Sequence, residues 1–156
     1  MRSPLALLFF LSFAILETEG CHVGWIQFQD KCYFFSHTAA TWFGAGSTCL
    51  LFHAKLAEPR SYDEINFLRS HSQSLNRHMW IGVSDIIEEG RFVYTSTQEV
   101  VQYTDFEPGE PGGHLSQNCV ILWNDFHGKW ADFYCASRLY YVCEEIVTSY
   151  PGNVIG

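Results

Sequence analysis

Six cysteines are the side chains most able to do chemistry in this chain of 156 residues. They could bind zinc or form disulfide bonds. Zinc sites generally take cysteines in close pairs, about two to four residues apart, whereas the nearest two here, Cys135 and Cys143, are eight positions apart. An even number in an oxidising compartment indicates three disulfides instead, and the spacing leaves their pairing open. The full set is Cys21, Cys32, Cys49, Cys119, Cys135 and Cys143.

The first twenty residues predict such a compartment. A positive start at Arg2 precedes an apolar run over residues 5–15, which only Ser12 interrupts, and small residues end the segment at Gly20. This layout is typical of a secretory signal peptide over residues 1–20, cleaved after Gly20. A membrane anchor is the alternative, but a span takes about twenty apolar residues and this run is shorter. We therefore expect a secreted, extracellular protein without a transmembrane segment.

The charge of the chain argues against nucleic acid as a partner. Acidic residues outnumber basic ones 17 to 9, which gives a net charge of −8 at pH 7, and the lysines and arginines form no cluster. Phosphate backbones bind basic patches, so we expect no nucleic-acid binding. With 47% hydrophobic residues and only 17% charged ones, the chain should fold into one packed domain.

Helix and strand signals both occur along the chain and predict an α+β domain. Apolar residues at spacings of three and four, from Trp42 to Phe52, predict a helix that starts at Thr41. Ser61 and Glu64 form a capping box that begins a second, shorter helix. Extended segments are expected at residues 32–36, 54–57, 79–83, 91–96, 120–122 and 140–144.

A long irregular loop is expected over residues 105–116. Its central segment, Phe106-Glu-Pro-Gly-Glu-Pro-Gly-Gly113, contains two prolines and three glycines. Neither a helix nor a β-ladder can run through such a sequence. Long loops within compact domains are often functional, so this loop is the first place to look for a binding site.

Several short motifs, in this order, resemble those of a C-type lectin domain. The resemblance spans nearly all of residues 21–146, leaving 147–156 as a flexible tail, and the pair Cys21 and Cys32 is similar to the long form of that domain. As a single secreted domain, the chain is also similar to perlucin-like invertebrate lectins. The motifs are Cys32-Tyr33, Trp80-Ile-Gly-Val83, Gly109-Glu-Pro111, Asn118-Cys-Val120, Gly128-Lys-Trp130 and Tyr141-Val-Cys-Glu144.

The resemblance implies a fold and a disulfide pattern. It implies a C-type lectin-like fold, with two helices packed on small antiparallel sheets and a long irregular loop. The implied disulfides are Cys21–Cys32, Cys49–Cys143 and Cys119–Cys135.

The same resemblance implies a calcium-dependent sugar site. In the family, Ca²⁺ is held by a Glu-Pro-Asn or Gln-Pro-Asp triplet, by an acid two residues before a cysteine, and by a Trp-Asn-Asp triplet, and sugar hydroxyls complete its shell. The matching residues here are Glu110, Gln117 and Asp132 as metal and carbohydrate ligands, with Trp130 as a further carbohydrate contact.

Three of the matching positions have lost a ligand. Gly112 and Ala131 stand where the family has amides, and Gln117 is neutral where an acid is usual. We therefore expect Ca²⁺ binding to be weak or absent, and the sugar is not identified. A second calcium site of the family has also lost ligands here, because Gly113 and Asn118 stand in place of acids.

Two other features in or near the loop leave alternatives open. Trp123-Asn124-Asp125 spells the family triplet but lies too far before Cys135, so it is either a turn at a strand end or part of a displaced site. His114 lies in the loop and is the one histidine that could substitute as a ligand.

No catalytic motif stands out. The seven histidines are scattered without HExxH spacing, and no GxSxG motif occurs. Glu110 and Asp132 could be a glycosidase acid pair, but they match calcium ligands, so we expect no enzyme. The expected function is a secreted carbohydrate-binding lectin that recognises glycans on microbial or cell surfaces, as in innate immunity. The alternative is a calcium-independent module that binds a protein or a mineral phase.

Overall fold

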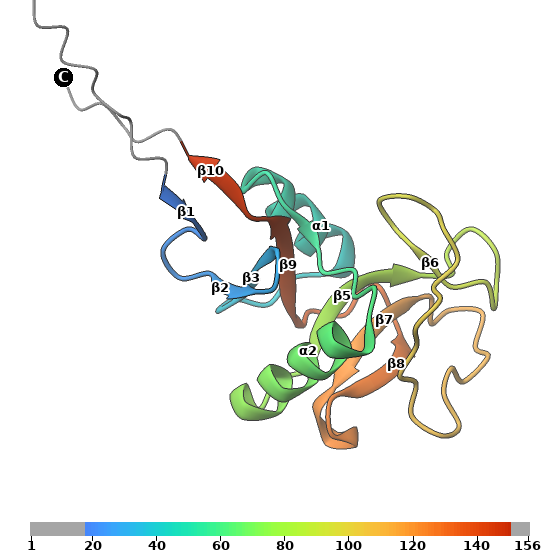
Figure 1. The fold of residues 1–156 in the computed structure, drawn as a ribbon. Helices are drawn as coiled ribbons and strands as arrows, with labels where there is room; N and C mark the ends of the chain where they lie inside the picture. Colours follow the sequence, from blue (N-terminus) through green and yellow to red (C-terminus); the bar gives the residue numbers. More distant parts are fainter. Residues whose placement is uncertain (1–17, 151–156) are drawn as a thin grey trace, which may run out of the picture.

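A computed structural model describes residues 18–150 of the chain, so the apolar run of the expected signal peptide lies outside the described residues. Two helices and two sheets make up the described part (Figure 1). In chain order the elements are β1 (Thr18–Gly20), β2 (Ile26–Phe28), β3 (Lys31–Phe35), α1 (Trp42–Leu51), β4 (Lys55–Leu56), α2 (Tyr62–Leu75), β5 (Met79–Ser84), β6 (Val93–Tyr94), β7 (Cys119–Trp123), the 3-10 helix η1 (Asn124–Phe126), β8 (Lys129–Phe133), β9 (Tyr140–Ile146) and β10 (Thr148–Tyr150).

The larger sheet is mixed, not purely antiparallel as expected. Its strand order is β2-β3-β9-β5-β7-β8, with β4 paired to β9 and β6 paired to β5. The exception is the pairing of β5 with β9, which is parallel and aligns Met79 with Tyr140 and Trp80 with Tyr141. Parallel neighbours need a long connection, and here the whole segment from β6 to β8, including the loop, lies between them. The fold class is otherwise as predicted.

The first and last strands of the described chain form the second sheet. β1 and β10 are antiparallel, and Thr18 is aligned with Tyr150. These strands lie in the segments assigned from sequence to the signal peptide and to the tail. The boundaries at Gly20 and residue 147 stay predictions, and cleavage after Gly20 would remove β1.

Helix α1 forms where its apolar spacing predicts. Thr41 is the N-cap, and its Oγ1 accepts a hydrogen bond of 3.1 Å from the Gly44 N–H. The buried face carries Trp42, Ala45 and Cys49. The predicted face does not extend to Phe52, which is the C-cap and is 43% exposed.

Helix α2 is longer than α1, so the expectation of a shorter second helix was wrong. The capping box is present at its start, where Ser61 accepts a hydrogen bond from the Glu64 N–H. The Glu64 carboxylate reaches back one residue further, to the N–H of Arg60 at 2.6 Å. Beyond Leu68 the helix is mostly polar, which hid its second half, but Ser72 is buried and extends the packed face. Asn76, in the left-handed conformation, ends it.

Two core clusters lie on opposite faces of the sheet. In β7, Val120 and Leu122 belong to the cluster that includes Ile65 and Leu68 of α2, whereas Ile121 belongs to the cluster that includes residues of α1. Successive residues of a strand point to opposite faces. This strand therefore reads as an unbroken apolar run because both its faces are covered.

All three disulfides pair as the resemblance implies. Cys49–Cys143 ties α1 to β9 and closes a loop with a sequence separation of 94 residues. In the chain-entropy account, such a crosslink stabilises the fold by about 4 to 5 kcal/mol. The described residues leave no cysteine free.

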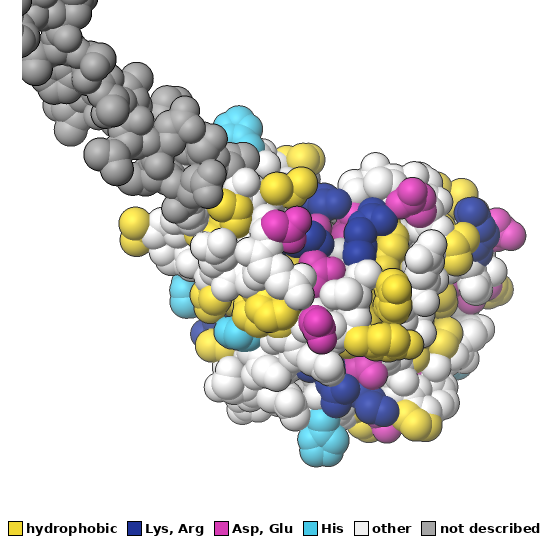
Figure 2. All heavy atoms as spheres, in the orientation of Figure 1, with side chains coloured by type: hydrophobic (Ala, Val, Ile, Leu, Met, Phe, Trp, Pro, Cys, Tyr) yellow, Lys and Arg dark blue, Asp and Glu magenta, His cyan; other side chains and the backbone are white. Residues whose placement is uncertain are grey.

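A network of buried ion pairs connects the strands near α1 and α2. Glu58 is fully buried and is bonded by Lys55 and Arg60, while Lys31 bridges Glu64 and Glu144. Figure 2 shows basic and acidic side chains next to one another across the middle of the visible face. The charges on this face are therefore mixed in sign rather than gathered into one field.

The expected strand over residues 91–96 is reduced to two residues, Val93 and Tyr94. The chain turns immediately afterwards, since the Gln98 N–H donates to the Tyr94 carbonyl and Gln98 has a positive φ of 61°. β2 and β8 were not anticipated from the sequence.

Candidate functional site

The long loop has no regular secondary structure over residues 107–116, as the sequence predicts. Its start is fastened to β8 through backbone hydrogen bonds, because the Trp130 N–H donates to Asp105 and the Glu107 N–H donates back to Trp130. The Phe106 ring meets the Trp130 ring edge-on, with centroids 5.6 Å apart. Strand β8 therefore positions the loop.

Trp130 is fully buried in the α2-side core. Its Nε1 is also buried and makes no hydrogen bond among the described residues. The resemblance implies that Trp130 contacts carbohydrate, yet a fully buried ring offers no face to a sugar. Its observed role is to support the loop from beneath.

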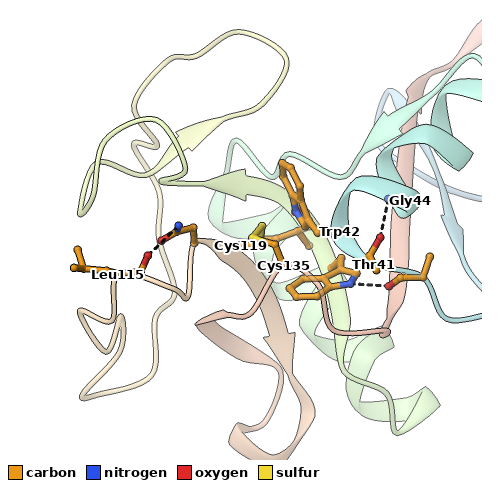
Figure 3. Close-up of a disulfide and its surroundings, with 10 residues drawn as sticks. Thr41, Trp42, Gly44, Leu115, Cys119 and Cys135 are labelled. Carbon is orange, nitrogen blue, oxygen red and sulfur yellow. Dashed lines mark hydrogen bonds between the residues drawn. A yellow bond between two sulfur atoms is a disulfide. The ribbon is translucent and has the colours of Figure 1, made fainter.

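A disulfide fastens the other end of the loop (Figure 3). Cys119, at the start of β7, is bonded to Cys135, and the Asn118 side chain donates a hydrogen bond of 3.3 Å to the Leu115 carbonyl. The Cys135 carbonyl in turn accepts a hydrogen bond of 3.0 Å from the N–H of Trp42, at the start of α1. The loop is thus held at both ends by the core.

Two carboxyl groups meet between the loop and β8. Asp132 is only 2% exposed, and its Oδ1 accepts the N–H of Gly112 at 2.9 Å. Glu110, preceding Pro111 in a cis peptide bond, is hydrogen-bonded to Asp132. Burial, followed by the hydrogen bond and charge of Asp132, raises the pKa of Glu110 to about 7. Below about pH 7 Glu110 therefore keeps its proton and can share it with the Asp132 carboxylate.

This pair can exchange its proton for a cation. Two carboxylates in hydrogen-bond contact repel each other when both are ionised, and a divalent cation between them removes that repulsion. Carboxylate oxygen is also the ligand type that Ca²⁺ prefers. Proton and cation therefore compete for the same atoms.

The structure does not join the third predicted ligand to this pair. Gln117 is half-buried and its backbone N–H donates to the His114 carbonyl at 2.8 Å. Among residues 18–150, its side-chain amide has no hydrogen bond to Glu110 or Asp132. His114 instead occupies the space beside Gly112, where a Cβ would lie 3.0 Å from the imidazole Cδ2.

Two acidic residues that sequence reasoning missed lie close to the pair. Asp85 is 2% exposed, and its Oδ1 is buried without a hydrogen-bond partner in the described structure. Burial, and then the charge of Asp132, raise the pKa of Asp85. The pKa of Glu89 is also raised, by desolvation first and then by the charges of Asp85 and Asp132. The sequence signals these acids only through the acidic segment 88–90, which predicts no more than a turn.

The donors present fit a hard cation only in part. Ca²⁺ takes six to eight oxygen ligands, and the pair contributes two carboxylates, with the unpaired oxygen of Asp85 nearby. In the part of the chain that is described, no three His, Cys, Asp or Glu side chains are grouped so that they could hold a metal ion together. To bind Ca²⁺, the Asp85 carboxylate would have to approach the Glu110–Asp132 pair, and other oxygens would have to complete the shell.

The Trp123-Asn124-Asp125 triplet forms a turn at the end of β7, one of the two alternatives left open by the sequence. Residues 124–126 are the 3-10 helix η1. The Asn124 side chain donates to the side-chain oxygen of Asn76, at the end of α2. In the β7–β8 register, Val120 lies opposite Asp132 and Trp123 lies three residues further on, opposite Lys129. The triplet is therefore at the far end of the strand from the acid pair.

Comparison with known proteins identifies the family. The family model of the lectin C-type domain matches residues 38–145. The chain therefore belongs to the C-type lectin domain family. Its membership agrees with the expectation that the protein is not an enzyme.

The relatives differ in length and setting. The low affinity immunoglobulin epsilon Fc receptor of Mus musculus is 35% identical over 130 residues, which cover 82% of this chain but only 38% of the receptor. Salivary C-type lectin 2 of Aedes albopictus is 32% identical over 150 residues, which cover 86% of this chain and 95% of that lectin. This chain thus spans less than half of the mouse receptor and nearly all of the mosquito protein.

A solved structure confirms the fold. The cow C-type carbohydrate-recognition domain of CD23, crystallised in the presence of a GlcNAc2Man3 oligosaccharide, superposes with a TM-score of 0.75 at 34% identity. The match covers 84% of this chain and 99% of that domain. Within residues 18–150, neither helix has the length and apolar character needed to cross a membrane.

Proposed function

We propose that this protein is a secreted lectin that binds glycans on microbial or cell surfaces through a weakened calcium site. The proposed ligands are Glu110 and Asp132, with Gln117 as a further oxygen donor. The observation that carries the proposal is the contact between the Glu110 and Asp132 carboxyls beside the loop. The two acids are held together by a shared proton, and within residues 18–150 neither is ion-paired with a lysine or arginine. A bound cation would therefore take the place of the proton.

Each residue has a defined part in this proposal. Bound Ca²⁺ would supply a hard centre that accepts vicinal sugar hydroxyls. Asp132 is fixed by the Gly112 N–H and so holds one carboxylate oxygen in place. Glu110 lies in the loop and, once ionised, can accept a hydrogen bond from a sugar hydroxyl. Gln117 can turn its amide toward the same space.

The comparisons support this proposal at the level of the family. The cow domain named above is described as a carbohydrate-recognition domain, and the mosquito relative is named as a salivary lectin. The leader-like segment over residues 1–20 supports secretion. Recognition of surface glycans would give the protein a role in innate immunity.

A second candidate is a calcium-independent module that binds a protein or a mineral phase. It is favoured by the loss of ligand atoms at Gly112 and Ala131 and by the neutral Gln117. It is also favoured by the shared proton, which lets Glu110 and Asp132 coexist without a metal. Under this alternative, the same fold would persist while its calcium site is inactive.

Thermal unfolding of the secreted chain separates these candidates. Calcium is titrated against a chelator, and the melting temperature is followed for the wild type and for Glu110→Gln. A ligand that binds only the folded state stabilises it by about 2.7 kcal/mol at a hundredfold excess over Kd. We expect a saturable rise for the wild type and none for Glu110→Gln. A glycan array in calcium would then identify the sugar.

Glu107→Gln is the matched control for this experiment. Glu107 lies in the same loop, but its carboxylate is ion-paired with Lys129 at 3.6 Å rather than with the acid pair. It should therefore keep the calcium response. A wild type that does not respond, even in millimolar calcium, would refute the proposed site and favour the calcium-independent candidate.

A further inference from the structure

Helix α1 presents an outer face without charge. None of its ten residues is acidic or basic, although an exposed helix usually carries charged residues on its solvent side. Three large apolar side chains point outward instead, with exposed fractions of 62% for Phe43, 68% for Leu50 and 80% for Leu51. Between them lie Gly46 and Ser47. We call these five residues the α1 face.

A groove runs alongside the α1 face. It has a volume of about 350 Å³ and lies between α1 and strand β4. Phe43 and Leu50 form one rim, and Trp42 and Leu56 contribute to its apolar lining. The apolar ridge of the helix and the apolar groove are therefore neighbours on one surface.

We propose that the α1 face binds the α1 face of a second copy of this chain, forming a dimer with twofold symmetry. A twofold interface places the same patch of both subunits in contact, so the patch must complement itself. The α1 face meets this condition, because Phe43 and Leu50 of each copy can enter the groove of the other. This proposal is independent of the calcium site and does not depend on the proposed function.

The patch supplies about half of the area that each partner buries in an interface of standard size. If a large apolar side chain buries about 200 Å², the three exposed residues offer about 400 Å² between them. An interface of standard size buries about 800 Å² per partner, and homodimer interfaces are about 65% apolar. The α1 face and its groove together can therefore supply most of the apolar part.

The α1 face carries no charge, which favours an uncharged partner surface, such as that of a second copy, over a charged partner. Each chain carries a net charge of −8, so two copies repel at long range, and only a contact surface without charges adds no further local repulsion. The α1 face is such a surface. At the edge of the groove, Lys55 is already paired with Glu58, so an acidic or basic peptide would gain little there.

The helix is also shaped for close approach. Gly46 and Ser47, at the middle of the face, are small and let two helix backbones come together. Figure 1 shows α1 on the side of β5 away from the long loop. The dimer would therefore leave both loops accessible, and two linked sites can bind a surface with greater avidity than one.

Sedimentation equilibrium of the secreted chain tests this proposal. We expect the wild type to be a dimer over a concentration series that reaches the micromolar range. Ser47→Arg places a charge at the centre of the α1 face and should weaken the dimer by about 30-fold or more, as loss of an interface hot spot does. Its matched control is Ser70→Arg in α2, because both serines are exposed and donate to the carbonyl four residues earlier.

A second pair of variants guards against misfolding. Leu50→Glu should also weaken the dimer, whereas Leu115→Glu, at a residue 79% exposed in the long loop, should leave it intact. Circular dichroism checks that each variant is folded. A wild type that stays monomeric would overturn the proposal. So would a dimer that folded Ser47→Arg and Leu50→Glu both leave unchanged, since its interface would lie elsewhere.

Discussion

Glu58, in the ion-pair network, and Glu110, in the loop, are held by their neighbours in opposite ways. Glu58 is fully buried and accepts hydrogen bonds from Lys55 and from Ser96. Burial tends to raise its pKa, but these bonds outweigh burial and leave the pKa lowered. Glu110 has no ion pair with a lysine or arginine among residues 18–150 and is bonded to Asp132, so burial and its partner act together and its pKa rises to about 7.

The difference separates acids that maintain the fold from acids that are available to a ligand. A carboxylate paired with lysine is already neutralised, so a metal ion would have to displace its partner. A carboxyl pair that shares a proton gains directly from a cation. Perturbed acids of the second kind are the better candidates for a functional site.

The largest expected effect comes from breaking the core network. Glu58→Ala removes the buried acceptor of the Ser96 N–H and one partner of the half-exposed Lys55 and Arg60, and a polar group left without its partner costs about 1 to 3 kcal/mol. Urea unfolding of the secreted chain measures this loss. The control is Glu88→Ala, because Glu88 is exposed and should change stability by less than about 0.5 kcal/mol. Equal losses for both variants would contradict the structural role of Glu58.

Glu58 and Glu110 should make the stability of the protein depend on pH in opposite directions. Glu58 has a lowered pKa, so its contribution is present above its ordinary value of 4.5 and is lost as the pH falls below it. Glu110 has a raised pKa, so its contribution is present below 4.5 and is lost as the pH rises from 4.5 to about 7.

Melting temperatures measured from pH 4 to 8 in chelator, with Glu110→Gln as comparison, test this contrast. We expect the wild type to lose stability relative to Glu110→Gln as the pH rises from 4.5 to about 7. Added calcium should offset the loss, increasingly at higher pH, because it replaces the shared proton. Parallel curves for the two proteins would show that Glu110 does not titrate in this window.

The smallest effect should come from rebuilding a ligand in the loop. Gly112→Asn alone would bring a Cβ within 3.0 Å of the His114 ring, so His114→Ala is made with it. The added amide oxygen should tighten calcium binding by about tenfold, as changes near a metal often do. Isothermal titration calorimetry measures the affinity, with His114→Ala alone as control. An unchanged affinity would show that residue 112 does not face the ion.

Local signals predicted the scaffold better than the site. The apolar spacing around Trp42 and Cys49 was enough to locate α1, because one packed face requires that spacing. The prolines and glycines from Pro108 to Gly113 were enough to predict the loop, because they exclude ladders and helices. The disulfide pairs required the resemblance to a family, since spacing alone left their connections open.

Long-range relations were harder to predict from the chain. Asp85 and Glu89 come close to Asp132 only through the packing of the sheet, so their positions in the sequence do not predict that they are neighbours. The parallel pairing of β5 with β9 is hidden for the same reason. The polar second half of α2 was missed because its helical form depends on the buried Ser72 rather than on an apolar repeat.

The pairing of β1 with β10 has a practical consequence for handling the protein. Thr18 and Tyr150 are aligned, so the two ends of the described chain leave the domain side by side, at a corner away from the loop (Figure 1). An affinity tag, a surface linker or a fused protein joined beyond β10 would leave from this corner, whereas one joined before β1 would be lost if the chain is cleaved after Gly20. An attachment beyond β10 would orient the domain with its loop facing outward.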